Sequence, residues 1–448
     1  MTVLVVALVA LAVCALLVGV HRWLWIRLVR DTTAPGGVPR RVGTALAIAL
    51  PLLSVAALTA GRAGAPFWLQ QTVSWPGYLW LAVLLYLTLT MLVAEPIRAL
   101  LLRRLAHRGP SGAVAGPPAA HSAPSAGTPE SGTATAAALA SSAGTGTGTG
   151  TGPGAVLAAD GPVRAPAAAA PGGGLSRRTF VARTLGGTAA AVALGTVGNG
   201  AYGVLRGPGV RRVQVPLAKL PRAAHGFRIA VVSDVHLGPV LGRAHAQRIV
   251  DTVNRTQPDL IAIVGDLVDG SVPDLGPAAE PLRGLTARHG SFFVTGNHEY
   301  FSGAEQWVEH VRELGLTPLE NARRALPHFD LAGVNDIQGE REGSGPDFQA
   351  ALGDRDRTRA AVLLAHQPVV IHDAVRHGVD LQLSGHTHGG QLWPGNFLAD
   401  LANPTVAGLE RYGDTQLYVS RGAGAWGPPV RVGAPSDITV VELASYQA

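Results

Sequence analysis

The sequence has little cysteine and little charge. A single cysteine, Cys14, stands among 448 residues, so the chain can form no intramolecular disulfide and no thiolate metal cluster. Any metal ion must therefore be bound through nitrogen and oxygen atoms. Charged residues make up only 15% of the chain, against 47% hydrophobic residues. This composition indicates a globular domain of about 200 residues combined with a membrane region.

The excess of basic over acidic residues is small, at 36 Lys and Arg against 30 Asp and Glu. The surplus lies mainly in short segments that flank long apolar runs. Such a distribution suits the anionic headgroups of membrane lipids better than a nucleic-acid groove. We therefore expect membrane lipids as partners and no nucleic acid.

Three apolar runs without charged residues lie in the first hundred residues. They cover residues 2–20, 42–60 and 78–94, near the roughly 20 residues that span a bilayer as a helix. The connection between the first two runs carries five Arg and one Asp, whereas the connection over 61–77 carries only Arg62. The positive-inside rule places the first connection in the cytoplasm. The sequence thus predicts a multi-pass membrane region over 1–108 with three transmembrane helices.

The composition changes after this region. Residues 109–174 are rich in Ala, Gly, Thr and Pro, include the run GTGTGTGTGPG, and contain almost no large apolar side chains. A segment of this kind cannot bury enough apolar surface to offset its chain entropy. We expect a disordered linker.

The next segment, 175–206, allows two interpretations. Its start, Ser176-Arg177-Arg178-Thr179-Phe180, resembles a twin-arginine export signal. The same arginines could flank a fourth transmembrane helix, and both interpretations place the following domain outside the cytoplasm. A cytoplasmic domain is the third alternative, because glycines and Asn199 weaken the hydrophobicity of the segment.

From Val213 onward the sequence is typical of a globular domain, which we place over 213–448. Short apolar stretches predict strands, and 244–254 predicts a helix with one apolar face. The predicted strands are FRIAVVSD, DLIAIVGD, SFFVTGNHE, AAVLLAHQP, DLQLSGHTH, LYVSRG and ITVVELA. Strands that alternate with helices indicate an α/β domain.

Polar residues follow five of these strands. In parallel sheets, ligands bind beyond the carboxyl ends of the strands, so we expect these residues to converge on one edge. In an Asp-x-His sequence, side chains two residues apart in an extended segment point the same way. Carboxylate, imidazole and amide groups together suit Mn, Fe or Zn better than Ca. The candidates are Asp234, His236, Asp266, Asn297, His298, His366, His386 and His388.

The motif series D-x-H, G-D-x-x-D, G-N-H-E, H-Q-P and G-H-T-H-G-G-Q resembles the calcineurin-like metallophosphoesterases, over roughly residues 228–443. The Gly-Gly-Gln ending and the stretch RGAGAWGPPVRVGAPSDITVVEL resemble in particular the membrane-associated bacterial subgroup that includes YkuE and YaeI. The resemblance implies a sandwich of two β-sheets flanked by helices.

The resemblance also implies a site with two divalent metal ions. One ion would be bound by Asp234, His236 and His388, and the other by Asn297, His366 and His386. Asp266 would bridge the two. His298, which receives no metal in this scheme, is the candidate proton donor to the leaving group. Asp269 and Glu299 allow two interpretations: they orient ligand imidazoles, or they are solvated carboxylates of the loops.

The predicted function is metal-dependent hydrolysis of a phosphate ester or pyrophosphate by a membrane-anchored enzyme. The membrane region favours a lipid-linked substrate, as in UDP-2,3-diacylglucosamine hydrolases. A non-catalytic membrane sensor or scaffold with the same fold is the main alternative, and a nucleic-acid phosphodiesterase is a weaker one. A metallo-β-lactamase-like site requires His-x-His-x-Asp-His, and here Gly390 and Gln391 replace the last two residues.

Overall fold

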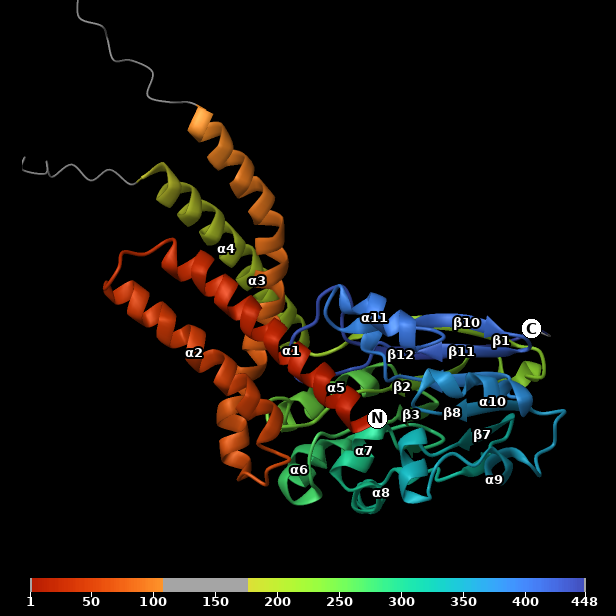
Figure 1. Ribbon diagram of the computed structural model, residues 1–448. Helices are drawn as coiled ribbons and strands as arrows, with labels where there is room; N and C mark the ends of the chain where they lie inside the picture. Colours follow the sequence, from red (N-terminus) through yellow and green to blue (C-terminus); the bar gives the residue numbers. More distant parts are fainter. Residues whose placement is uncertain (1, 108–175, 447–448) are drawn as a thin grey trace, which may run out of the picture.

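The computed structural model describes residues 2–107 and 176–446 (Figure 1). The segment 109–174, for which the sequence predicts a linker, lies outside these residues. The described residues form a group of long helices and a sandwich of two β-sheets, which lie side by side.

Within residues 2–107 and 176–446, four helices are long and apolar enough to cross a bilayer. Each of the three predicted apolar runs corresponds to one helix, with residue 60 just past the end of the second, and the segment at 177–205 forms a fourth helix. It runs alongside α3 (Figure 1). The helices are α1 (Thr2–Trp25, continued by a π-helical turn over Ile26–Arg30), α2 (Val38–Thr59), α3 (Phe67–His107) and α4 (Arg177–Leu205).

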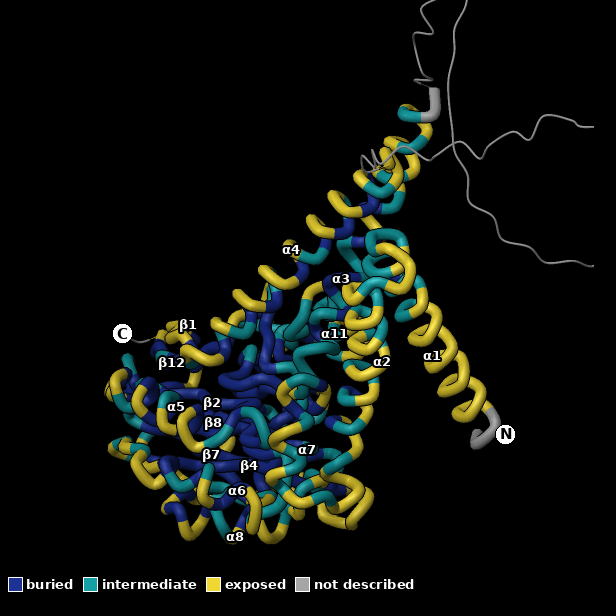
Figure 2. Tube along the Cα trace, turned by 90° about the vertical axis from the view of Figure 1, so that its left-hand side faces the viewer, coloured by how far each residue is buried: buried dark blue, intermediate teal, exposed yellow. Residues whose placement is uncertain are grey.

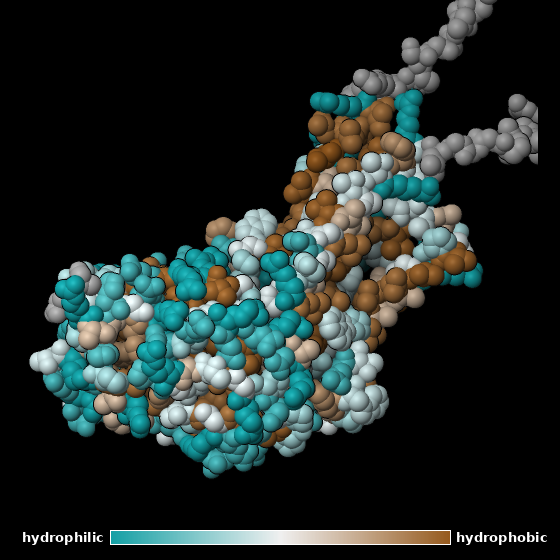
Figure 3. All heavy atoms as spheres, turned by 180° about the vertical axis from the view of Figure 1, so that it is seen from behind, coloured by the Kyte–Doolittle hydropathy of each residue, from teal (hydrophilic) through white to brown (hydrophobic). Residues whose placement is uncertain are grey.

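Close helix contacts in this bundle depend on small residues. A Cβ atom on Gly77 of α3 would collide with the Leu53 carbonyl of α2 and would lie 2.7 Å from the Cβ of Ala57. Small residues let helix backbones approach closely where water does not drive their association. Apolar atoms cover much of the outer surface of the bundle (Figure 3).

The sandwich consists of two six-stranded mixed sheets, as the sequence predicted. The first has the order β1-β12-β2-β3-β4-β5 and is parallel except between β12 and β2. Its strands are β1 (Gly209–Leu217), β2 (Phe227–Val232), β3 (Leu260–Val264), β4 (Ser291–Val294), β5 (Thr317–Pro318) and β12 (Asp437–Ser445).

The second sheet has the order β10-β11-β9-β8-β7-β6, and its two outer pairs are antiparallel. Its strands are β6 (Ala322–Ala325), β7 (Phe329–Gly333), β8 (Ala360–Leu364), β9 (Leu381–Ser384), β10 (Gly408–Tyr412) and β11 (Thr415–Val419). Each predicted strand overlaps one of the observed strands, and none of them accounts for β1, β5, β6, β7 and β10.

Three apolar layers hold the sandwich together, and its interior is mostly buried chain (Figure 2). The middle layer joins the inner faces of the sheets. It contains Ile229 and Leu260 from the first sheet and Val362 and Leu364 from the second. The outer layers lie under the helices α5 (Arg243–Arg255), α6 (Val272–Ala279), α8 (Ala304–Glu313), α9 (Phe348–Leu352) and α10 (Ile371–Arg376). Helix α7 (Asn297–Ser302) contributes no residue to them and buries only Glu299. Helix α11 (Gly395–Ala402) lies apart from these layers, near the bundle.

Candidate metal centre

The predicted site residues gather at one end of the sandwich. The prediction of one sheet edge is wrong in one respect, because two sheets contribute. The loops after β2, β3 and β4 come from the first sheet, and those after β8 and β9 come from the second. The carboxyl ends of both sets of strands meet there, so side chains far apart in the sequence face each other.

The backbone around these side chains is unusual. Residues with a side chain seldom adopt positive φ, and such strain often occurs at functional sites. The expectation that Asp234-x-His236 lies in an extended segment is therefore wrong, since the chain turns at both residues. Positive φ occurs at Asp234 (52°), His236 (49°), Asp266 (53°), His386 (72°) and His388 (53°).

Glycine is required at 385 because of a close approach. A Cβ atom there would collide with Ser233 Oγ and Asp234 Oδ2. The loop after β9 therefore lies directly against Asp234, and the His386 N–H donates to Asp234 Oδ1 at 2.9 Å. Gly389 and Gly390, by contrast, have φ values of 62° and 82°, which glycine adopts without strain.

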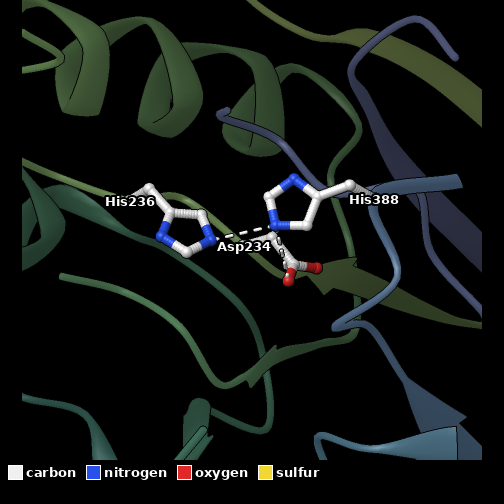
Figure 4. Close-up of side chains that lie close together, drawn as sticks. All are labelled: Asp234, His236 and His388. Carbon is white, nitrogen blue, oxygen red and sulfur yellow. Dashed lines mark hydrogen bonds and ion pairs between the residues drawn. The ribbon is translucent and has the colours of Figure 1, made fainter. Parts of the chain in front are cut away.

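One group of side chains consists of Asp234, His236 and His388 (Figure 4). All three are buried. His236 Nε2 lies 3.0 Å from His388 Nε2, which in turn lies 3.4 Å from Asp234 Oδ1. Two ring nitrogens and a carboxylate oxygen thus point at a common centre, as the ligands of a cation do.

A second group consists of Asp266, His366 and His386, with Asn297 beside it. His386 Nδ1 lies 3.0 Å from Asn297 Oδ1 and 3.3 Å from His366 Nε2. His366 donates its other ring hydrogen, at Nδ1, to the Val264 carbonyl at 2.8 Å. Because this bond occupies Nδ1, Nε2 is the ring nitrogen of His366 that faces the site.

Asp266 lies between the two groups. Its Oδ2 is 3.1 Å from His366 Nε2 in the second group and 3.8 Å from His236 Nε2 in the first. Burial raises the pKa of this carboxyl, but His366, His236 and His298 together outweigh burial and hold the pKa well below its usual value. Asp266 is therefore a carboxylate that faces both groups.

The imidazoles differ in charge state. Burial, helped by the positive charge of His366, lowers the pKa of His386 to about 4. Burial and the charges of His236 and Arg431 lower the pKa of His388 well below its usual value. Burial also acts on His366, but Asp266 raises the pKa of that imidazole well above its usual value. His386 and His388 are thus neutral at pH 7, the form that binds metal.

Asp269 contacts two histidines, as predicted for an imidazole acceptor. His236 and His298 each donate from Nδ1 to its Oδ1, at 2.9 Å and 2.6 Å. Burial raises the pKa of Asp269, but the two histidines lower it to about 2. Burial lowers the pKa of His298, but Asp269 and Asp266 raise it to about 9. His298 therefore holds a proton at neutral pH, although it also lies close enough to His236 and Asp266 to share a cation.

Glu299 has a different role from the predicted one. Its buried carboxylate accepts hydrogen bonds from three backbone N–H groups rather than from an imidazole, those of Asp266 (2.9 Å), Leu267 (2.8 Å) and Gly296 (2.6 Å). Burial and the charge of Asp266 raise its pKa to about 7. Glu299 thus ties the loop after β3 to the loop after β4, and it fixes the backbone that carries Asp266.

Arg431 contacts the site, and the sequence did not predict it. The side chain is buried, and its Nη1 donates to the carbonyls of His388 and Ala434, each at 3.1 Å. Its Nη2 lies 3.1 Å from His388 Nδ1. The sequence contains only a weak signal for this contact. The stretch around Arg431 resembles a bacterial subgroup of phosphoesterases, but no residue pattern in it indicated a contact with a histidine.

The comparisons with known proteins agree with this geometry. The family model described as calcineurin-like phosphoesterase matches residues 227–390. A "Transmembrane protein with metallophosphoesterase domain" from Danio rerio is 41% identical over 250 residues, which cover 53% of this chain and 57% of that protein. An "Uncharacterized metallophosphoesterase" from Helicobacter pylori is 38% identical, over 56% of this chain and 68% of the relative.

A third relative is shorter. The "Uncharacterized metallophosphoesterase YkuE" of Bacillus subtilis is 30% identical over 291 residues, which cover 60% of this chain and 98% of that protein. The chain therefore spans nearly all of this relative, but only about half of the Danio rerio protein. On these matches, the chain belongs to the calcineurin-like metallophosphoesterase family.

Proposed function

We propose that this protein is a membrane-anchored phosphoesterase that uses two divalent cations to hydrolyse a phosphate ester or pyrophosphate bond. The observation that carries the proposal is the pair of ligand groups that share Asp266. A single structural cation would need only one of these groups. Two groups joined by a carboxylate suit a phosphate bound between two cations.

The side chains present fit such cations. In the first group, His236 Nε2 and His388 Nε2 face each other at 3.0 Å, an arrangement of ring nitrogens that suits a divalent cation. One cation would be bound by Asp234, His236 and His388, the other by Asn297, His366 and His386, and both by Asp266. Nitrogen and oxygen donors of this kind favour Mn, Fe or Zn. When bound, the cations neutralise the phosphate and supply hydroxide near neutral pH.

His298 would donate the proton that the leaving oxygen needs. The Nδ1 of His298 lies 2.6 Å from Asp269 Oδ1. The Nε2 of His298 lies 4.0 Å from Asp266 Oδ2, so the N–H at Nε2 faces the carboxylate between the two ligand groups. Proton donation of this kind contributes about 10² to 10⁴-fold to a rate.

The bundle supports an extracytoplasmic position for the catalytic domain. Its basic end lies away from the sandwich, where Arg183 of α4 donates to the Thr32 carbonyl at 2.9 Å and Arg27 of α1 pairs with Glu95 of α3. At the other end, Gly200 of α4 accepts from the Arg431 N–H of the sandwich at 3.3 Å. The positive-inside rule places the basic end in the cytoplasm.

The proximity of the bundle favours a lipid-linked substrate. Helix α4 ends at Leu205 and β1 begins at Gly209, so the domain cannot lie far from the bilayer. A cavity of about 670 Å³ opens where α4 meets the sandwich, and its lining includes Arg206, Arg211, Arg421 and Arg431. Four guanidinium groups beside a membrane helix suit phosphate-bearing headgroups.

An assay of the purified full-length protein would test this proposal. With Mn added, we expect turnover of p-nitrophenyl phosphate or its bis-ester, and of a phosphorylated lipid in vesicles. Metal binding without turnover of any of these would favour the sensor or scaffold alternative. Activity confined to soluble nucleotides would reject the lipid-linked substrate alone.

A further inference from the structure

Helix α11 exposes large apolar side chains that no other part of the sandwich covers. Leu401 is 85% exposed, Leu398 71% and Phe397 61%, and Trp393, just before the helix, is 51% exposed. No residue of α11 is buried. Positions 397, 398 and 401 share one face of the helix. A contiguous apolar patch of this kind on a folded domain indicates an interaction surface.

The segment that leads into α11 touches the helical bundle. The Tyr86 hydroxyl of α3 donates to the Trp393 carbonyl at 2.9 Å. Leu392 and Val432 pack into the apolar cluster formed mainly by α3 and α4. Tyr86 lies inside the apolar run 78–94, so this part of the sandwich reaches the bundle at a level where its helices are apolar. The segment that leads into α11 therefore adjoins the apolar part of the bundle.

We propose that α11 is an interfacial helix that lies in the lipid leaflet on the domain side of the membrane. Its face of Phe397, Leu398 and Leu401 would contact acyl chains. Eight residues of helix measure only about 12 Å, so α11 cannot span a bilayer of about 30 Å. Asn396 and Asp400 make the rest of the helix polar, which suits a position in the plane of the interface.

The position of α11 fixes the height of the metal centre above the membrane. The turn His386–Gly390 lies directly against the start of α11, since a Cβ atom on Gly390 would collide with the Asn396 backbone. The Gly395 N–H also donates to the Leu392 carbonyl at 2.6 Å. A helix seated in the leaflet would thus hold His386 and His388 at the level of lipid headgroups. This consequence rests on the proposed function, whereas the insertion itself does not.

Spin labelling tests the insertion without any assay of activity. Cys14 is the only cysteine, so a Cys14→Ala background allows one nitroxide label at Leu401→Cys and, separately, at Leu398→Cys. The matched control is Val375→Cys on α10, which is 38% exposed and distant from the bundle. The full chain is placed in vesicles of phosphatidylcholine and phosphatidylglycerol.

We expect labels at 401 and 398 to collide with oxygen and to be shielded from a water-soluble nickel chelate. The label at 375 should collide with the nickel chelate more than with oxygen. Equal nickel access at all three positions would overturn the insertion. Spin–spin broadening at 401 would also overturn it, because it would show that a second copy of the chain covers the patch.

A double variant, Leu398→Asp with Leu401→Asp, tests the consequence for the substrate. We expect turnover of a vesicle-borne phosphorylated lipid to fall at least tenfold while p-nitrophenyl phosphate turnover stays within twofold. Equal turnover of the vesicle substrate would overturn the link between α11 and the site. If the wild type turns over neither compound, the proposed function fails while the label result still decides the insertion.

Discussion

The two ligand groups of the metal centre differ in what holds their imidazoles. In the first group, charged side chains support the ligands: Asp269 accepts from His236, and Arg431 contacts His388. In the second group, His366 is held by a backbone carbonyl, that of Val264. Changes to neighbouring side chains should therefore disturb the first group more than the second, whereas Asp266 lies between the groups and faces both.

Removal of Asp266 should have the largest effect. In Asp266→Ala the carboxylate that faces both groups is lost, and the buried imidazoles lose their negative partner. We expect metal content and phosphoesterase activity to fall to background. Asp274→Ala, which removes an exposed carboxylate bonded to Ser271, is the control that should leave both unchanged. Normal metal content in Asp266→Ala would refute its bridging role.

Loss of one ligand from each group should separate the two cations. We expect His388→Ala and His366→Ala each to retain about one cation per chain in place of two, because each removes a ligand from one group only. Activity should be almost lost in both, since both cations contact the phosphate. Elemental analysis of metal after gel filtration measures the stoichiometry. If either variant lost both cations, the groups would form a single site.

His298→Ala should retain both cations and lose rate. We expect turnover of an alkyl phosphate to fall about 10² to 10⁴-fold, because the leaving alkoxide needs a proton. The loss should be smaller with p-nitrophenyl phosphate, whose leaving group needs little protonation. His372→Ala, an exposed histidine on α10, is the control. An equal loss with both substrates would argue against proton donation by His298.

Asp269→Asn should have the smallest effect and should act on the first group alone. The amide removes the negative charge that holds His236 and His298 but keeps a similar shape. Such supporting residues typically contribute about 10 to 100-fold to metal affinity. Metal titration should therefore show one weakened and one unchanged dissociation constant. Weakening of both would show that the two groups do not have separate supports.

The sequence predicted the strands that bear the candidate ligands at their ends, but it missed the buried strand β7. It predicted β2, β3, β4, β8 and β9 because each is a buried apolar run, and the ligand-bearing loops begin at their ends. The edge strands β6 and β10 have the sequences ARRA and GLERY and are largely exposed, so hydrophobicity gave no signal for them. Their partners β7 and β11 supply the hydrogen bonds that make them strands.

Contacts between distant residues could not be predicted from the sequence. The carboxylate of Glu299 binds backbone N–H groups, which every residue offers, so nothing in the sequence identified Asp266 and Leu267 as its partners. Arg431 reaches His388 across 43 positions through the folded loop. The positive φ angles at Asp234 and His386 are set by the loops around them, because neither residue type requires them.

The measurement that tests the central claim most directly is the metal content of the purified full-length protein, determined together with its phosphoesterase activity, before and after chelation. We predict about two divalent cations per chain, loss of activity as they are removed, and recovery when Mn is restored. Full activity in protein that holds no cation would contradict the account. Binding of only one cation per chain at saturating metal would also contradict it.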